Sequence, residues 1–123
     1  MRLYERIEDA GMSPEVLAAF RRGLSEVAGA SGLPDVEQAL LAGLFDRLVP
    51  PDIDPAPFDE LWSHADLFLT AALTVAVSDG RYGLEEARVI GFLASRLGYS
   101  AGDLAAIEGR VFSELRAHGR TLR

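Results

Sequence analysis

The stretch "LFLTAALTVAV", residues 67–77, decides the fold. It is apolar except for two threonines, so a helix built from it has no polar side of its own. Such a helix lies in the middle of a bundle, and the stretch is well short of the roughly 20 apolar residues that cross a bilayer. We predict helix over residues 58–77, with a break near residues 63–66, where the pattern changes from mixed to almost wholly apolar. Its expected core residues are Leu67, Leu69, Ala72, Leu73, Val75 and Val77.

The rest of the chain is also patterned for helices. Apolar residues recur at helical spacing, and no segment alternates for long enough to predict a strand. The predicted fold class is all-α, a compact bundle of about five to seven helices. Ser13 and Pro14 mark a helix start, because serine caps free N–H groups and proline suits the first helical position. A second helix is expected from Asp35 to just before Pro50, since the residue before a proline avoids the helical conformation.

Two further helices are expected after the central one. The first follows the turn at residues 78–83 and is closed by Gly98. The last begins at Ser100, where Asp103 completes a capping box with that serine. Between the second and the central helix, the proline-rich "PPDIDPAP", residues 50–57, is expected to be a stiff loop.

The length of 123 residues fits one domain with its own core. We expect a single domain over residues 1–123, with residues 1–12 as an N-terminal extension and residues 117–123 as a frayed tail. The first residues carry scattered charges and no apolar run, so they do not resemble a signal peptide. We therefore expect a cytoplasmic location.

The composition narrows the function classes. The net charge is −7, all 12 basic residues are arginine, as is typical of a GC-rich bacterial genome, and there is no cysteine. Disulfides and thiolate metal sites are therefore excluded. An acidic surface repels phosphate backbones, which argues against nucleic acid as a partner, and no segment is suited to direct membrane insertion. We expect a protein partner or a homo-oligomer.

The turn "SDGRYGLEE", residues 78–86, is the candidate functional segment. Much of it is what is expected where one helix ends and the next begins, since Glu85 and Glu86 suit the positive N-terminal end of the following helix. Asp79 does not fit that account, because a carboxylate at a helix C-terminus costs roughly 0.3 to 1 kcal/mol. Either Arg81 offsets it, or a hard cation such as Ca²⁺ or Mg²⁺ binds Asp79 and Glu86, with Glu85 as a speculative third ligand.

The segment of residues 71–104 resembles the TerB-like domain, which occurs in tellurite-resistance proteins and in some membrane-anchored DnaJ-type co-chaperones. The shared pattern is apolar-Ala-x-x-Asp-Gly-x-apolar-x-x-x-Glu, followed by an amphipathic helix and an "LGYS" break. Ala76, Asp79 with Gly80, Tyr82 and Glu86 occupy the pattern here.

The resemblance implies an all-helical fold of two pseudo-symmetric halves, a divalent-metal site and a non-enzymatic role in stress resistance. An earlier copy of the motif is then expected within residues 39–62, with Asp46 in place of Asp79 and Asp52 or Asp54 as the later acid. Arg47 replaces the glycine there and the proline-rich loop intrudes, so these three aspartates are speculative ligands.

Three classes of function are compared with the sequence features. The first is a TerB-like accessory protein in a stress or defence response, with a divalent cation at Asp79 and Glu86. The alternative is a metal-independent adaptor that binds another protein. An enzyme has little support, because Ser63 and His64 are adjacent and cannot face one another on a helix, and no phosphate loop accompanies them.

Gly91, in the middle of a predicted helix, is expected to permit close helix packing.

Overall fold

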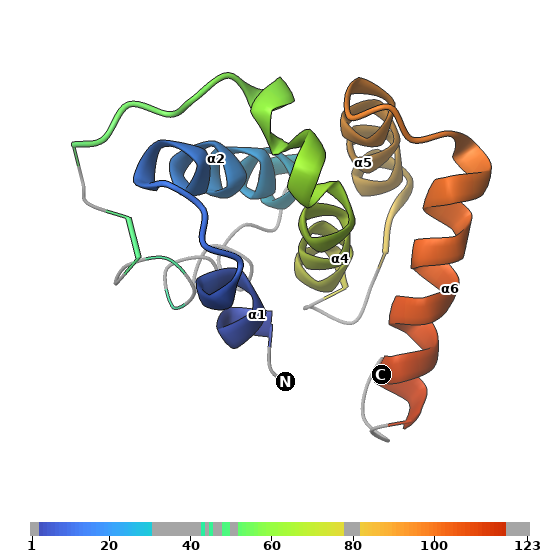
Figure 1. Cartoon of the computed structure of the whole chain (residues 1–123). Coiled ribbons are helices and arrows are strands. Elements are labelled where there is room, and N and C mark those ends of the chain that lie inside the picture. Colours follow the sequence, from blue (N-terminus) through green and yellow to red (C-terminus); the bar gives the residue numbers. More distant parts are fainter. Residues whose placement is uncertain are drawn as a thin grey trace.

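A computed structural model describes residues 3–30, 43, 45, 48–49, 52–77 and 82–117. Its regular structure over these residues is helical, which confirms the all-α prediction there (Figure 1). The helix expected from Asp35 to Pro50 lies mostly outside the described residues, but Phe45 within it is buried. The elements are α1 (Leu3–Asp9), α2 (Pro14–Ala30), the 3-10 helix η1 (Phe58–His64), α4 (Ala65–Ala76), α5 (Leu84–Arg96) and α6 (Ala101–Ala117).

Helix α4 is the centre of the bundle, as its apolar sequence predicts. It contacts α1, α2, η1, α5 and α6. Most of its side chains are buried, including Leu69, Leu73 and Val75. Leu67 is the exception among the predicted core residues of this stretch, because it is only partly buried. The expected break is confirmed at the junction of His64 and Ala65, where the 3-10 helix gives way to the α-helix.

The predicted helix ends are confirmed where they fall on described residues. The Val16 N–H donates to Ser13 Oγ over 3.2 Å at the start of α2. At the end of α5, Gly98 has a φ of 85°, and the Tyr99 N–H donates to the Ala94 carbonyl over 2.9 Å. This is the Schellman arrangement, in which a left-handed glycine lets the chain turn back on the last helical carbonyls.

The capping box at the start of α6 is complete. The Ser100 N–H donates to Asp103 Oδ2 over 3.0 Å, and the Asp103 N–H donates to Ser100 Oγ over 3.1 Å. Two free N–H groups of the helix start are thereby satisfied by side chains, as the sequence predicts.

Aromatic rings join α2, η1 and α4. The Phe68 ring lies edge-on to Phe20 and to Phe58, with centroid distances of 5.2 and 5.3 Å. Gly23 lets α2 approach this cluster, because a Cβ there would lie 2.7 Å from two ring atoms of Phe68. Gly91 differs from its prediction: a Cβ on it would meet no atom of the described residues within 4 Å.

The N-terminal segment is part of the bundle rather than a plain extension. Leu3–Asp9 forms α1, whose Ile7 is buried in the core beside α4. The described part of the proline-rich loop, residues 52–57, is irregular as expected. It is fixed to α2 by the Ala56 N–H, which donates to the Glu15 carbonyl over 3.0 Å.

Candidate functional site

Glu86 is the buried carboxylate of the candidate turn. It lies in the first turn of α5 and is only 2% exposed. Its Oε1 accepts the Gly83 N–H over 3.0 Å. This is the acidic half of a capping box, and Gly83 has no side chain to supply the other half. Part of the role of Glu86 is therefore to end the turn and start the helix.

Glu85, the adjacent acid, faces solvent. Its Oε1 lies 3.4 Å from the Arg88 guanidinium, and both side chains are well exposed. Consecutive residues on a helix point about 100° apart, so Glu85 and Glu86 do not converge on one point. Asp79 lies outside the described residues, as do Gly80, Arg81 and Asp46.

The other speculative ligands lie elsewhere. Asp52 and Asp54 are exposed residues of the loop before η1. Figure 1 places this loop and the start of α5 on opposite sides of the molecule, so the structure does not bring either aspartate to Glu86. Within the described part of the chain, no three histidine, aspartate or glutamate side chains form a group suited to a metal ion.

Tyr82 links the turn to helix α6. Its hydroxyl donates to Glu108 Oε2 over 3.0 Å, and its ring packs on Phe112 with a centroid distance of 5.7 Å. Burial raises the pKa of Tyr82 well above its ordinary value, and the hydrogen bond to Glu108 and the negative charges of Glu108 and Glu86 raise it further. The phenol thus stays protonated as a donor between two acids from different helices.

A second polar cluster joins α4 to α6. Arg110 Nη2 lies 2.8 Å from Asp66 Oδ1 and donates to Thr70 Oγ1 over 3.0 Å. Asp66 and Arg110 line an open hollow of about 380 Å³, together with Tyr99 and Asp103. The hollow is shallow and mixed in charge, and it lacks the enclosing apolar walls of a small-molecule pocket.

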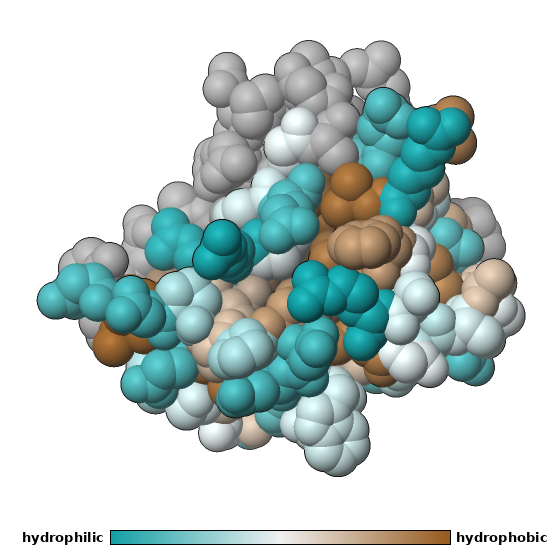
Figure 2. All heavy atoms as spheres, turned by 90° about the horizontal axis from the view of Figure 1, so that it is seen from above, coloured by the Kyte–Doolittle hydropathy of each residue, from teal (hydrophilic) through white to brown (hydrophobic). Residues whose placement is uncertain are grey.

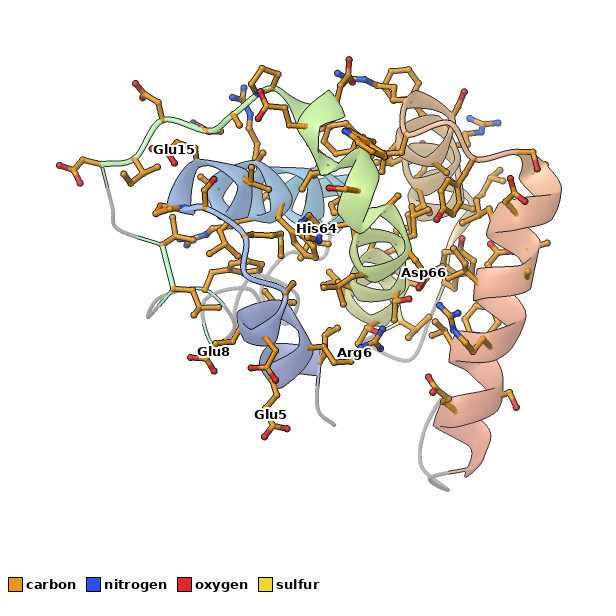
Figure 3. The ribbon with its side chains drawn as sticks, in the orientation of Figure 1. Glu5, Arg6, Glu8, Glu15, His64 and Asp66 are labelled. Atoms are coloured by element: carbon orange, nitrogen blue, oxygen red, sulfur yellow. The ribbon has the colours of Figure 1, made fainter. Side chains whose placement is uncertain are left out.

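The triad residue types near the start of α4 are not assembled. Figure 3 shows His64 on the α2 side and Asp66 on the α6 side of the junction between η1 and α4. Asp66 pairs with Arg110 instead. These side chains therefore do not form the nucleophile, base and orienting acid of a hydrolase.

Among the described residues, three large apolar side chains are well exposed to solvent. Trp62, Leu84 and Phe92 are 71%, 67% and 61% exposed. Figure 2 views the end of the molecule formed by η1 and α5, and it shows apolar surface in the centre bordered by strongly hydrophilic side chains. Two nearby aromatic residues pack inward: Phe68 is buried in the core, and Phe58 is partly buried against it.

Arginine and acid side chains connect η1 with α5 at this end. Arg96 Nη2 lies 3.1 Å from Asp59 Oδ1, and the guanidinium carbon lies 4.9 Å from the centre of the Phe58 ring. The sequence gives no signal for this contact or for Tyr82 with Glu108, because the partners are 37 and 26 residues apart. Helical spacing relates residues of one helix and not those of two.

Comparison of this chain with known protein families, with curated proteins and with solved structures gave no match. No helix within the described ranges has the length and apolar character needed to span a membrane.

Proposed function

We propose that this chain is a non-enzymatic, TerB-like accessory domain of a cytoplasmic stress or defence response in bacteria, and that it acts by binding another protein. The observation that carries the proposal is the exposure of Trp62, Leu84 and Phe92 in a domain that already has a well-filled core. Exposed aromatic residues beside arginine are the composition typical of protein interfaces.

The TerB-like part of the proposal concerns residues 71–104. What supports it is the helical arrangement of their described part, where α4 and α5 are followed by a break at Gly98 and by the start of α6. Two pseudo-symmetric halves belong to the same proposal. The segment for the first half, residues 39–62, falls largely outside the described residues.

A capture experiment tests the protein-binding function. Immobilised wild type is compared with Trp62→Ser/Phe92→Ser in a buffer containing a chelator, using lysate of the source cells. Ser113→Arg, a change at an exposed position of α6, serves as the control. We expect a defined protein to be retained by the wild type and the control and lost with the double variant, at an unchanged melting temperature. Equal retention by all three proteins, or retention only with added Ca²⁺, would contradict the proposal.

A second candidate function retains the divalent cation. One observation favours it: Glu86 is a buried carboxylate, and its negative charge adds to the effect of burial and of Glu108 in raising the pKa of the Tyr82 phenol. Against it stands the capping contact of Glu86 with Gly83, together with the outward position of Glu85. The cation would then depend on Asp79 as the partner ligand of Glu86. The described residues alone do not make a fitting ligand set.

A further inference from the structure

A hollow of about 260 Å³ lies between α2 and the chain segment that precedes η1. Three of its lining residues are polar, and all three belong to α2: Arg21, Arg22 and Ser25. They fall within five consecutive positions, so they lie within little more than one turn of the helix. Both charged residues are basic, although the chain as a whole has a net charge of −7. The hollow therefore presents positive charge and a hydroxyl group in a protein that is acidic overall.

The acids near the hollow do not line it. Glu26 follows Ser25 on α2, and two aspartates, Asp52 and Asp54, lie on either side of Ile53 in the loop. All three acids are exposed, and none of the described residues that line the hollow is acidic. A ligand inside the hollow thus faces positive charge, whereas a long polyanion that extends past it meets three carboxylates. This arrangement favours a small anion over a nucleic acid.

The remaining wall of the hollow is aliphatic. Ala18 and Val49 are buried, and Ile53 is partly buried against the core. Pro55 completes this wall, and a backbone hydrogen bond fixes the loop to α2. A few polar groups beside apolar walls are typical of small-molecule sites. The hollow is therefore suited to a ligand that joins an anionic group to a short aliphatic part.

The two arginines indicate which anion. A guanidinium has five N–H donors in a planar fork, so an arginine that already contacts the protein keeps donors for a ligand. A carboxylate has one negative charge and two oxygens, which a single fork matches. A phosphate monoester carries about −1.5 to −2 charges at pH 7 and three acceptor oxygens, so it suits two arginines together. The Ser25 hydroxyl supplies a further donor.

We propose that the hollow binds a small phosphate monoester, with the phosphate group on Arg21 and Arg22 and an aliphatic part against Ile53 and Pro55. The volume of about 260 Å³ lies below the roughly 300 Å³ at which sites for drug-sized ligands begin, which limits the ligand to a small molecule. The site goes beyond the proposed protein-binding function and does not depend on it. The loop beside the hollow and the start of α5 lie on opposite sides of the molecule (Figure 1), so the hollow is separate from the exposed apolar residues of α5.

Ligand titrations of the isotope-labelled protein, followed by the backbone amide signals in NMR, test the proposal. The probe is butyl phosphate. It is compared with inorganic phosphate, which lacks the aliphatic chain, with butanol, which lacks the charge, and with pentanoate, which replaces phosphate by carboxylate. We expect saturable shifts of the amide signals around Arg22 and Ile53. Butyl phosphate should bind at least about tenfold more tightly than each of the three other compounds.

Substitutions locate the site. Arg22→Gln, at an exposed position, should weaken binding of butyl phosphate at least about tenfold. Arg88→Gln makes the same change at an exposed position of α5 and should leave the affinity unchanged. Ile53→Ala should weaken binding of butyl phosphate but not of inorganic phosphate, a difference that a general loss of structure would not produce. The melting temperature of each variant shows that it is folded.

Each contrary result overturns a defined part of the proposal. No saturable shift with millimolar butyl phosphate excludes the site. Equal weakening by Arg22→Gln and Arg88→Gln shows attraction by overall charge instead of a built site. Pentanoate that binds as tightly as butyl phosphate overturns the choice of phosphate, and inorganic phosphate that does so overturns the aliphatic wall.

Two further comparisons separate this site from protein binding. A phosphoserine peptide that binds more tightly than butyl phosphate would assign the hollow to a modified segment of a partner protein and overturn the small-molecule ligand. Trp62→Ser/Phe92→Ser, the variant of the capture experiment, should bind butyl phosphate like the wild type. A loss of binding in that folded variant would overturn the separation of the two sites.

Discussion

Replacing Gly23 by alanine tests the packing of α2 on α4. A Cβ at this position would lie 2.7 Å from Cε1 and Cζ of Phe68 and 3.1 Å from Cε1 of Phe58. Carbon atoms in ordinary contact are about 3.5 to 4.0 Å apart, so the overlap is on the order of 1 Å. The Phe68 ring is fully buried between Phe20 and Phe58 and has no space to turn away. We expect α2 to shift outward from α4.

The magnitude follows from comparison with Gly91. Alanine is more favourable than glycine in a helix by up to about 1 kcal/mol, and this gain applies at both positions. At Gly91 no described atom opposes it, so Gly91→Ala should raise the free energy of unfolding by about 0.5 to 1 kcal/mol. At Gly23 the overlap adds a cost of about 1 to 3 kcal/mol. Gly23→Ala should therefore be less stable than Gly91→Ala by about 1 to 3 kcal/mol.

Urea denaturation followed by circular dichroism measures both free energies, at a low protein concentration that keeps association out of the comparison. Phe68→Leu provides an internal control. It should destabilise the wild type but recover part of the loss in the Gly23→Ala background, because it removes the ring atoms that overlap. If Gly23→Ala is as stable as Gly91→Ala, α2 does not pack on Phe68 through Gly23 and the reasoning is refuted.

Three further predictions concern the turn and the helix starts. Asp103→Ala should destabilise the domain at neutral pH. Hydrogen bonds with Ser100 at the start of α6 hold the pKa of Asp103 below its ordinary 3.8, so the difference from wild type should shrink as pH falls below that value. No difference at neutral pH, or a difference that does not change with pH, would contradict the capping role of the carboxylate. Tyr82→Phe should lower the free energy of unfolding by about 1 kcal/mol through loss of the bond to Glu108. Because the pKa of Tyr82 is raised in the folded state, the advantage of the wild type should decline above pH 10.0 in a urea series, and a constant difference would contradict it. Glu86→Ala should cost about 1 to 3 kcal/mol in the same assay, whereas Glu85→Ala should change stability by less than about 0.5 kcal/mol; equal effects would show that burial of Glu86 is not what stabilises the turn.

The local features of the fold were predictable because they depend on neighbouring residues. Ser13, Gly98 and the pair Ser100 with Asp103 end or begin helices through bonds within four or five positions, and each was identified from its residue type and place. The central position of α4 follows from its lack of a polar side. What could be read from the sequence was therefore the helices and their ends.

The contacts between helices were not predictable in this way. Gly23 and Gly91 both lie within helices, yet one faces a phenylalanine ring and the other faces open space. The Tyr82 bond to Glu108 likewise depends on how α6 lies against the turn. A single sequence shows which residues share a helix face but not which face of another helix lies opposite, so the candidate site was only partly foreseen.

The most direct test of the metal-independent function is the melting temperature of the chelated protein with and without millimolar Ca²⁺, Mg²⁺ or Mn²⁺, measured for the wild type and Asp79→Asn. A cation present at about a hundred times its dissociation constant adds roughly 2.7 kcal/mol, which amounts to a shift of several degrees. We predict no shift with any of the three cations in either protein, because Glu86 already serves the start of α5 and the proposed function needs no cation. A rise of several degrees in the wild type that Asp79→Asn abolishes would contradict this account and identify the turn as a cation site.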